Sequence, residues 1–166
     1  MRVFKEEQRF TQIWLLVIMG FSVVAPLYLI IREYNAMSTL AFGLTIFGVL
    51  LSFGLIFLFK LKTRIDEKGI HYQFFPFHLK YKTIKWNEIE KAYVRIYDPI
   101  GDYGGWGIKG GALWNKAKGK CVNVSGDIGL QLELKNGKKL LIGTQEKTAV
   151  TAILKTYFKK NNEQSE

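Results

Sequence analysis

Cysteine is nearly absent from this sequence of 166 residues, in which Cys121 is the single example. One thiol cannot form a disulfide within the chain, and such usage is typical of proteins that stay in a reducing compartment. Histidine is scarce as well: His71 and His78 are the two in the chain, and neither has a cysteine or carboxylate at ligand spacing. The sequence therefore predicts neither a disulfide scaffold nor a zinc site, and we interpret His71 as a surface residue of a strand.

Motifs that mark catalytic or nucleotide-binding sites are also missing. There is no Gly-x-Ser-x-Gly, no His-Glu-x-x-His and no P-loop sequence. Glycines 105, 107 and 110 match the spacing of a dinucleotide fingerprint, but strands instead of a helix are predicted to follow them. We therefore expect a protein that is not an enzyme and that uses no cofactor and no metal.

The remaining titratable candidates have simpler interpretations. Lys118 and Lys120 precede Cys121 and could lower the pKa of its thiol, but a packing role at the start of a strand explains the residue as well. Turn formation accounts for three loop carboxylates, Asp98, Asp102 and Asp127.

Charge is absent from two long stretches, Ile13–Ile31 and Leu40–Phe59. At a rise of about 1.5 Å per residue, each can cross the hydrocarbon core of a bilayer as one helix. The polar residues 32–39 between them suffice for a tight turn, so we predict a transmembrane hairpin with spans of about 13–31 and 40–59. The absence of ionisable residues within the spans argues against a transporter.

Basic residues flank this hairpin on one side. Arg2, Lys5 and Arg9 precede it, and further basic residues follow at 60, 62 and 64, whereas the connection has Arg32 offset by Glu33. The positive-inside rule then places both termini in the cytoplasm of a two-span protein of the cell membrane. We predict residues 1–62 to form this N-terminal part, with Met1–Gln12 as a short helical lead-in.

Gly48 and Ser52 form a small-xxx-small pair in the second span. Such a pair lets two helices approach closely. It can pack the hairpin on itself or on another copy, and packing within the hairpin is the plainer interpretation.

After the hairpin the hydrophobic period changes to that of strands. Turn signals stand at Glu67-Lys68-Gly69 and at Asn136-Gly137, and Trp86 and Ile89 are expected to anchor a corner to the core. An apolar stripe at helical spacing predicts a helix over 145–160, with Thr144 as N-cap, and a disordered tail over 161–166. The predicted fold class is α+β: a transmembrane hairpin, then an antiparallel β-barrel or sandwich over 63–160 that is capped by this helix.

The order of these features resembles the bacterial pleckstrin-homology-like domains. The motifs that carry the resemblance are Ile84-Lys85-Trp86-Asn87-Glu88-Ile89, the segment 129–143 and the terminal amphipathic helix, and many members follow a pair of transmembrane helices. The resemblance implies a seven-stranded scaffold with a C-terminal helix at one end. It implies no catalytic residues, and a fold of this kind does not determine function.

The net charge of +10 is concentrated after the hairpin, where residues 60–166 hold 20 Lys and Arg against 11 Asp and Glu. A basic domain beside a bilayer is attracted to anionic lipids, although the same charges can serve topology alone. The lysines are scattered, so we expect no nucleic-acid partner.

A glycine-rich stretch, Pro99–Gly111, has six glycines in its last eleven residues. One interpretation is a flexible loop that presents aromatic and basic side chains to a membrane interface or an acidic partner; the other is a bulged strand with Trp106 in the core. The candidate binding residues are Tyr103, Trp106, Lys109, Trp114, Lys116, Lys118 and Lys120.

The sequence thus predicts a membrane-anchored, non-catalytic binding or scaffold module whose domain engages a membrane protein or anionic lipid headgroups. The alternative is a structural subunit that assembles through the hairpin, with another membrane protein or with a second copy of itself.

Overall fold

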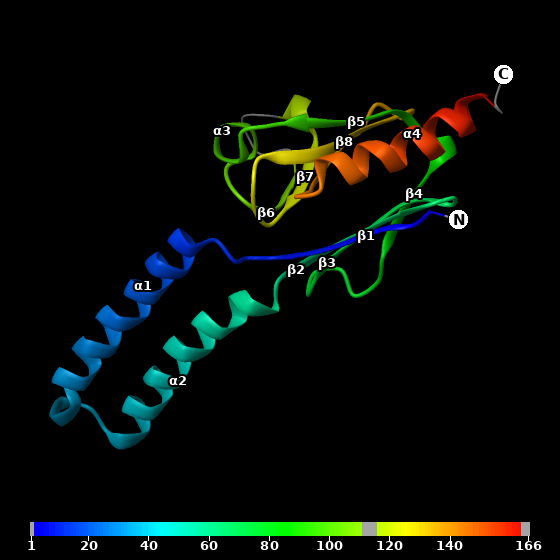
Figure 1. The fold of residues 1–166 in the computed structure, drawn as a ribbon. Helices are drawn as coiled ribbons and strands as arrows, with labels where there is room; N and C mark the ends of the chain where they lie inside the picture. Colours follow the sequence, from blue (N-terminus) through cyan, green and yellow to red (C-terminus); the bar gives the residue numbers. More distant parts are fainter. Residues whose placement is uncertain (1, 111–115, 164–166) are drawn as a thin grey trace. The chain divides into compact units, whose positions relative to one another are not determined.

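The structure, a computed structural model, describes residues 2–110 and 116–163. It contains two compact units (Figure 1). One is a helical hairpin, Phe10–Phe59, and the other is a β domain that combines Met1–Arg9 with Lys60–Glu166.

The hairpin consists of two apolar helices with a short connection. The elements are α1 (Ile13–Arg32), η1 (Tyr34–Ala36), α2 (Thr39–Leu55) and η2 (Ile56–Leu58). Ser38 accepts a hydrogen bond from the Ala41 N–H and so caps α2. The spans Ile13–Arg32 and Thr39–Leu58 both have a mean hydropathy of 2.4, with no residue buried. By length and composition, both are suited to cross a membrane, as predicted.

The small-residue pair is not used within the hairpin. Gly48 and Ser52 are both exposed, and a Cβ added at Gly48 would meet nothing within 4 Å. The predicted packing of this pair inside the hairpin is therefore wrong, because the two residues lie on a face of α2 that α1 does not cover.

The N-terminal segment is a strand, so the predicted helical lead-in is wrong. Strand β1 (Phe4–Arg9) pairs antiparallel with β2 (Lys60–Asp66), with Phe4 opposite Ile65 and Arg9 opposite Lys60. Its exposed residues Lys5, Glu7 and Arg9 alternate with the less exposed Phe4, Glu6 and Gln8, which is the pattern of a strand with one solvated face. Two strands separated by the whole hairpin thus form one ladder.

The β domain has two sheets. Sheet A has the order β1-β2-β3-β4 and sheet B the order β5-β8-β9-β7-β6. The further strands are β3 (Gly69–Phe75), β4 (Lys82–Lys85), β5 (Ile89–Ile96), β6 (Gly107–Gly110), β7 (Lys120–Asn123), β8 (Ile128–Leu134) and β9 (Lys139–Gly143). The described residues therefore hold nine strands, whereas the family resemblance implied seven.

The predicted turns and corner are confirmed. Asp66 pairs with Gly69 around Glu67 and Lys68, and Gly137 adopts a φ of 77° in the connection between β8 and β9. Trp86 begins η3 (Trp86–Glu88), is 5% exposed, and donates from Nε1 to the Asp66 carbonyl at 2.9 Å. These contacts fix the corner between the two sheets.

Two features of sheet B differ from the prediction. Strands β7 and β9 pair in parallel, with the single strand β8 between them in the chain, so sheet B is mixed. The glycine-rich stretch forms helix α3 (Pro99–Tyr103) and strand β6, with Asp98 accepting from the Ile100 N–H at 3.0 Å as the N-cap. It is therefore not a flexible loop throughout.

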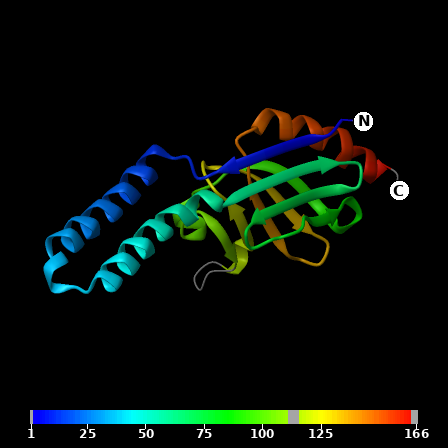
Figure 2. The ribbon, with the colours of Figure 1, turned by 90° about the horizontal axis from the view of Figure 1, so that it is seen from below.

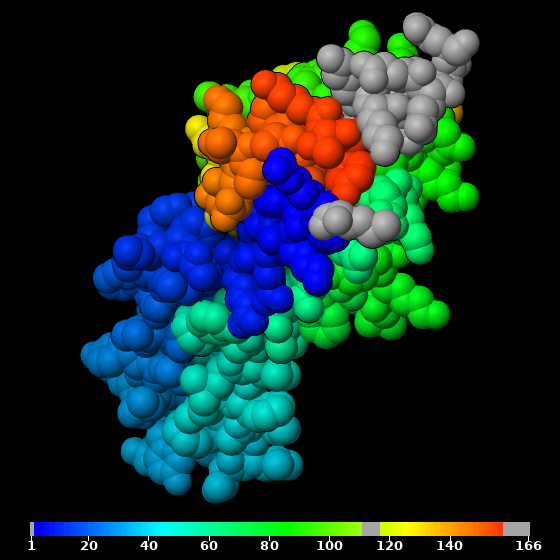
Figure 3. Space-filling model, turned by 45° about the vertical axis from the view of Figure 1, so that its right-hand side comes forward, coloured from blue at the N-terminus to red at the C-terminus, as the bar shows by residue number. Residues whose placement is uncertain are grey.

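Helix α4 (Lys147–Glu163) covers one side of the domain, where it contacts β5, β8, η3 and β1. Figures 2 and 3 show it alongside β1. Its buried residues Val150, Ile153 and Leu154 follow the predicted apolar stripe. The helix begins two residues later than predicted and continues through residues 161–163 of the predicted tail, while residues 164–166 lie outside the described part.

Thr144 does not form the predicted N-cap. It lies three residues before the first helical residue, and its hydroxyl donates to a Glu6 carboxylate oxygen at 2.7 Å. Its Oγ1 also accepts from the Glu146 N–H at 3.1 Å, so it shapes the turn that leads into α4.

Candidate functional site

The candidate loop residues do not form one exposed surface. Tyr103 is 4% exposed and its ring packs edge-on against Tyr97, with the ring centroids 5.9 Å apart. Its hydroxyl lies 3.2 Å from a guanidinium nitrogen of Arg95 and 3.3 Å from the Lys118 carbonyl. The prediction that Tyr103 contacts a partner is therefore wrong, because this side chain belongs to the core.

Lys118 is held by an ion pair within the domain. Its ammonium group donates to Asp102, whose second oxygen lies 3.5 Å from Arg95. The hydrogen bond from Lys118 lowers the pKa of Asp102 below its ordinary value, against the opposing effect of burial. This pair joins α3 to η4 (Lys116–Lys118), so Lys118 has a structural role.

The other loop residues are divided between contacts and solvent. Trp106 is half-buried and donates from Nε1 to the Gly126 carbonyl at 3.2 Å, while Lys109 is half-buried and Lys120 is exposed. Trp114 lies outside the described residues, and Lys116 lies in η4. The structure does not bring the predicted set together as one binding site.

Cys121 is fully buried beside Tyr97, Tyr103 and Leu141, which confirms the packing role. Burial raises the pKa of its thiol to about 12. A thiol with this pKa is almost entirely protonated at neutral pH, and the thiolate is the reactive form.

We expect Cys121 to resist alkylation in the folded chain. With a pKa of about 12, only about one thiol in ten thousand is ionised at pH 8. Iodoacetamide labelling, followed by mass spectrometry of the intact chain, should show at least a hundredfold slower modification without denaturant than with it. Equal rates would mean that this part of the core opens readily.

The outer face of sheet A carries a second group of candidate residues, which sequence reasoning did not identify as a site. Cross-strand register places Lys5 opposite Arg64 and Arg64 opposite His71, so three basic residues lie in one row across β1, β2 and β3. Like charges directly opposite one another are unfavourable in a sheet. We call the outer face the basic face and define it by Lys5, Arg9, Lys60, Lys62, Arg64 and Lys68.

Asp66 organises one end of the basic face. Its side chain is 7% exposed and accepts from Arg64 at 2.9 Å, from His71 Nε2 at 3.0 Å and from the Lys68 N–H at 2.9 Å. Burial favours the neutral acid, but the hydrogen bonds from His71 and Lys68 and the charges nearby outweigh it, so the pKa of Asp66 lies below its ordinary value. The His71 ring is also fixed by Thr83, at 2.8 Å from Nδ1.

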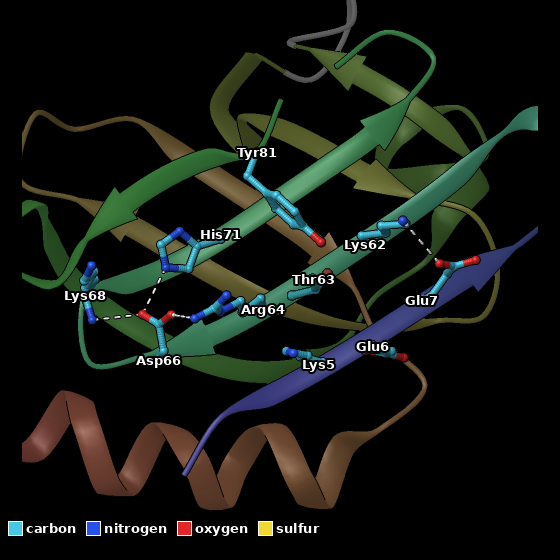
Figure 4. A pocket seen from close by; sticks show the side chains of 10 residues that line it. All are labelled: Lys5, Glu6, Glu7, Lys62, Thr63, Arg64, Asp66, Lys68, His71 and Tyr81. Atoms are coloured by element: carbon cyan, nitrogen blue, oxygen red, sulfur yellow. Dashed lines mark hydrogen bonds and ion pairs between the residues drawn. The ribbon is translucent and has the colours of Figure 1, made fainter. Parts of the chain in front are cut away.

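An open groove of about 630 Å³ runs along this face (Figure 4). Figure 4 shows Tyr81 reaching across it, and Glu7 paired with Lys62 at 3.5 Å. The ten residues that line the groove are Lys5, Glu6, Glu7, Lys62, Thr63, Arg64, Asp66, Lys68, His71 and Tyr81.

Strand β1 is fixed to the rest of the domain by polar contacts on its inner side. Glu6 accepts from the Thr144 hydroxyl and from the Gln145 N–H, both at 2.7 Å, and Gln8 donates to the Gly143 carbonyl at 2.8 Å. Burial raises the pKa of Glu6, against the lowering effect of these hydrogen bonds. The strand that supplies Lys5 and Arg9 is therefore part of the folded domain.

The chemistry available on the basic face is anion binding. Its side chains are ammonium and guanidinium groups, which bind carboxylates and phosphates. Within residues 2–110 and 116–163, no group of three or more His, Cys, Asp or Glu side chains is placed to hold a metal ion.

Sequence reasoning could have found part of this face. The alternation Lys60, Lys62, Arg64 was visible, but we assigned it to membrane topology. The contribution of Lys5 was not visible, because the pairing of β1 with β2 joins residues that are 59 positions apart (Lys5 and Arg64).

Comparison of the chain with protein-family models, with curated proteins and with solved structures gave no match. The resemblance to the bacterial pleckstrin-homology-like domains therefore stays a prediction.

Proposed function

We propose that this protein is a membrane-anchored, non-catalytic binding module whose β domain engages anionic lipid headgroups through the basic face. The observation that carries the proposal is the position of this face. The face begins at Lys60, the residue that directly follows the hairpin, and Arg9, the last residue before the hairpin, is paired with it. The domain is then held beside the surface that it recognises.

The hairpin supports anchoring in a bilayer. Its two spans have 20 residues each, which corresponds to about 30 Å of helix. Large apolar side chains along both helices are exposed, including Phe21 at 73% and Leu44 at 62%. A contiguous apolar surface of this kind is stable in hydrocarbon and unfavourable in water.

The β1–β2 ladder supports a two-span topology. Arg9 and Lys60 are paired residues of one sheet and stand at the two ends of the hairpin. Both ends must therefore lie on the same side of the membrane. Several basic residues flank the two ends of the hairpin, whereas the connection between the helices has one, Arg32, which is offset by Glu33. This difference favours the cytoplasmic side of the cell membrane for both termini.

Electrostatics supports a lipid partner. A basic residue close to an anionic leaflet contributes about 1 kcal/mol to membrane attraction, and this attraction decays within about one Debye length. The short connection at Phe59 keeps Lys60 and Lys62 within reach of the headgroups. An acidic segment of a membrane protein would satisfy the same charges and is the competing partner.

Energy transfer in nanodiscs tests the proposal with the full chain. A donor dye on Glu67→Cys reports the far end of sheet A, because Glu67 lies in the exposed turn between β2 and β3, and acceptor dyes are placed on lipids. We expect stronger transfer in nanodiscs of phosphatidylglycerol than of phosphatidylcholine. The triple variant K5Q/K60Q/K62Q should lose most of this difference, as should high salt.

A matched triple variant on the other side of the domain, K91Q/K147Q/K155Q, removes the same number of charges and should behave as the native chain. Transfer that is independent of lipid charge in the native chain would contradict a lipid partner. It would favour the acidic protein segment.

The alternative function, a structural subunit, is favoured by a different observation. Gly48 and Ser52 are exposed on α2, so they are free to contact a helix of another chain or of a second copy. We expect G48L/S52L to break such an assembly, which cross-linking in native membranes would detect, and to leave the β domain folded. Unchanged cross-links would exclude this face of α2 as the interface.

A further inference from the structure

The loop between β3 and β4, residues 76–81, exposes large apolar side chains. Leu79 is 77% exposed, Phe77 is 67% exposed and Tyr81 is 48% exposed. His78, the polar residue between the first two, is half-buried, with its ring centroid 5.8 Å from that of Tyr72. The loop thus turns apolar groups to the outside and its imidazole to the inside, the reverse of the usual arrangement.

This arrangement is held by hydrogen bonds along the loop. The His78 N–H donates to the Phe74 carbonyl at 2.8 Å, and His78 Nδ1 accepts from the Phe74 N–H at 3.3 Å. Gln73 donates from its amide to the Leu79 carbonyl at 2.9 Å. Because backbone groups on both sides of the tip are satisfied, the exposure of Phe77 and Leu79 is a property of the folded loop.

The loop lies at the end of sheet A where the chain enters the hairpin. Arg9, Lys60 and Phe75 stand in one row across β1, β2 and β3, and Pro76 follows Phe75 directly. Neighbouring strands are about 4.8 Å apart, so the loop begins within about 10 Å of the points where β1 ends and β2 begins. Those points are one residue from the hairpin on either side.

We propose that Phe77 and Leu79 insert into the interface between headgroups and acyl chains of the leaflet next to the β domain. The inference rests on the proposed function, because it takes the hairpin to span the bilayer. It adds a third attachment point beside the two ends of the hairpin. Because the loop follows β3, two strands away from β1, this contact limits how far the row of strand ends can tilt away from the bilayer surface.

The neighbouring residues favour a bilayer over a protein partner. Lys80 and Lys82 are exposed on either side of Tyr81. Lysine and tyrosine place an apolar stem or ring in the interface and a polar end in water, which suits the headgroup region. The basic face on the same sheet adds attraction toward the same anionic surface.

Spin labelling of the full chain in nanodiscs tests the inference. The discs contain equal parts of phosphatidylcholine and phosphatidylglycerol, and one label is placed per chain, since Cys121 is buried. A label at Leu79→Cys should collide often with oxygen, which is concentrated in the bilayer. It should collide less often with a water-soluble nickel complex than a label in water does. A label at Ile100→Cys, where the native side chain is 66% exposed on α3, should collide with the nickel complex freely.

A third label at Leu44→Cys, in the middle of α2, separates the two proposals. If the Leu44 label is protected from nickel but the Leu79 label behaves as the Ile100 label does, insertion of the loop is overturned and the anchor stands. If the Leu44 label also meets nickel, both proposals fail. A Leu79 label that is shielded from oxygen as well as nickel would indicate a protein partner and overturn the inference.

A substitution at the loop tip provides a second measurement. Phe77→Ser in the Leu79→Cys chain should restore collisions with nickel, because one of the two inserting side chains is gone. Tyr93→Ser, which removes an aromatic residue that is 41% exposed on β5, should leave the depth of the label unchanged. If the Leu79→Cys label lies at the same depth in the bilayer with native Phe77, with Phe77→Ser and with Tyr93→Ser, the role of Phe77 is contradicted.

Discussion

Replacing Trp86 with alanine is expected to lower the free energy of unfolding of the β domain by about 3–5 kcal/mol. The ring is 5% exposed and stacks on Tyr157, with centroids 6.1 Å apart. Its loss leaves a cavity at the corner between the sheets and removes the hydrogen bond to the Asp66 carbonyl. Hydrogen exchange of β2 and β3 amides in the full chain should become about a hundred to a few thousand times faster.

Two variants show where this effect originates. Trp86→Phe keeps a ring in the corner but cannot donate to Asp66, and should cost about 1–2 kcal/mol. Trp14→Ala removes a tryptophan that is 49% exposed in α1, and should leave exchange in the β domain unchanged. If Trp86→Ala accelerated hydrogen exchange in β2 and β3 no more than Trp14→Ala does, the corner would not be part of the cooperatively unfolding core.

Replacing Asp66 with asparagine is expected to cost about 2–3 kcal/mol at neutral pH, since hydrogen bonds to a charged group are lost. Arg64 and His71 both donate to this carboxylate, whose side chain is 7% exposed. Glu67→Gln is the matched control, because Glu67 is the exposed carboxylate of the same turn. The measurement is again hydrogen exchange, at β2 and β3 amides.

The cost of Asp66→Asn should depend on pH in a defined direction. The pKa of Asp66 is lower in the folded chain than its ordinary value of 3.8. The carboxylate therefore stabilises the fold above the ordinary pKa, and this stability is lost as the pH falls through the folded pKa. The difference between native chain and variant should be constant from neutral pH to about pH 5 and shrink below about pH 4. A difference that persists unchanged in acid would show that the charge is not the cause.

Features set by local patterns were predictable from the sequence. Two uncharged stretches of span length became α1 and the α2–η2 segment, and the turn at Asn136-Gly137 joins β8 to β9 as expected. Each of these depends on residues close together in the chain, where helix length or turn type is decided by the side chains themselves. Helix α3 belongs to this class although we missed it. Asp98 before Pro99 and Gly104 after Tyr103 are the usual start and stop signals.

Features set by distant pairing were not predictable in this way. Glu6 faces inward in β1, which looks unfavourable for a strand until Thr144 and Gln145 are placed beside it. Tyr103 looked like a surface aromatic because it lies in a glycine-rich stretch, but its partner Arg95 lies in β5 and its partner Tyr97 directly follows that strand. In each case the burial of a residue depends on contacts that sequence spacing does not reveal.

The pairing of β1 with β2 also has a consequence for biosynthesis. Residues 4–9 leave the ribosome first but cannot complete sheet A until the hairpin has been synthesised and β2 has followed it. If the hairpin spans a membrane, as we propose, a nascent chain that inserts only one of the two helices leaves β1 and β2 in different compartments. Sheet A then lacks an edge strand, and Thr144 lacks its partner Glu6. On this proposal, sheet A is complete only after both helices have inserted, and a chain with one inserted helix would expose an incomplete sheet to proteolysis.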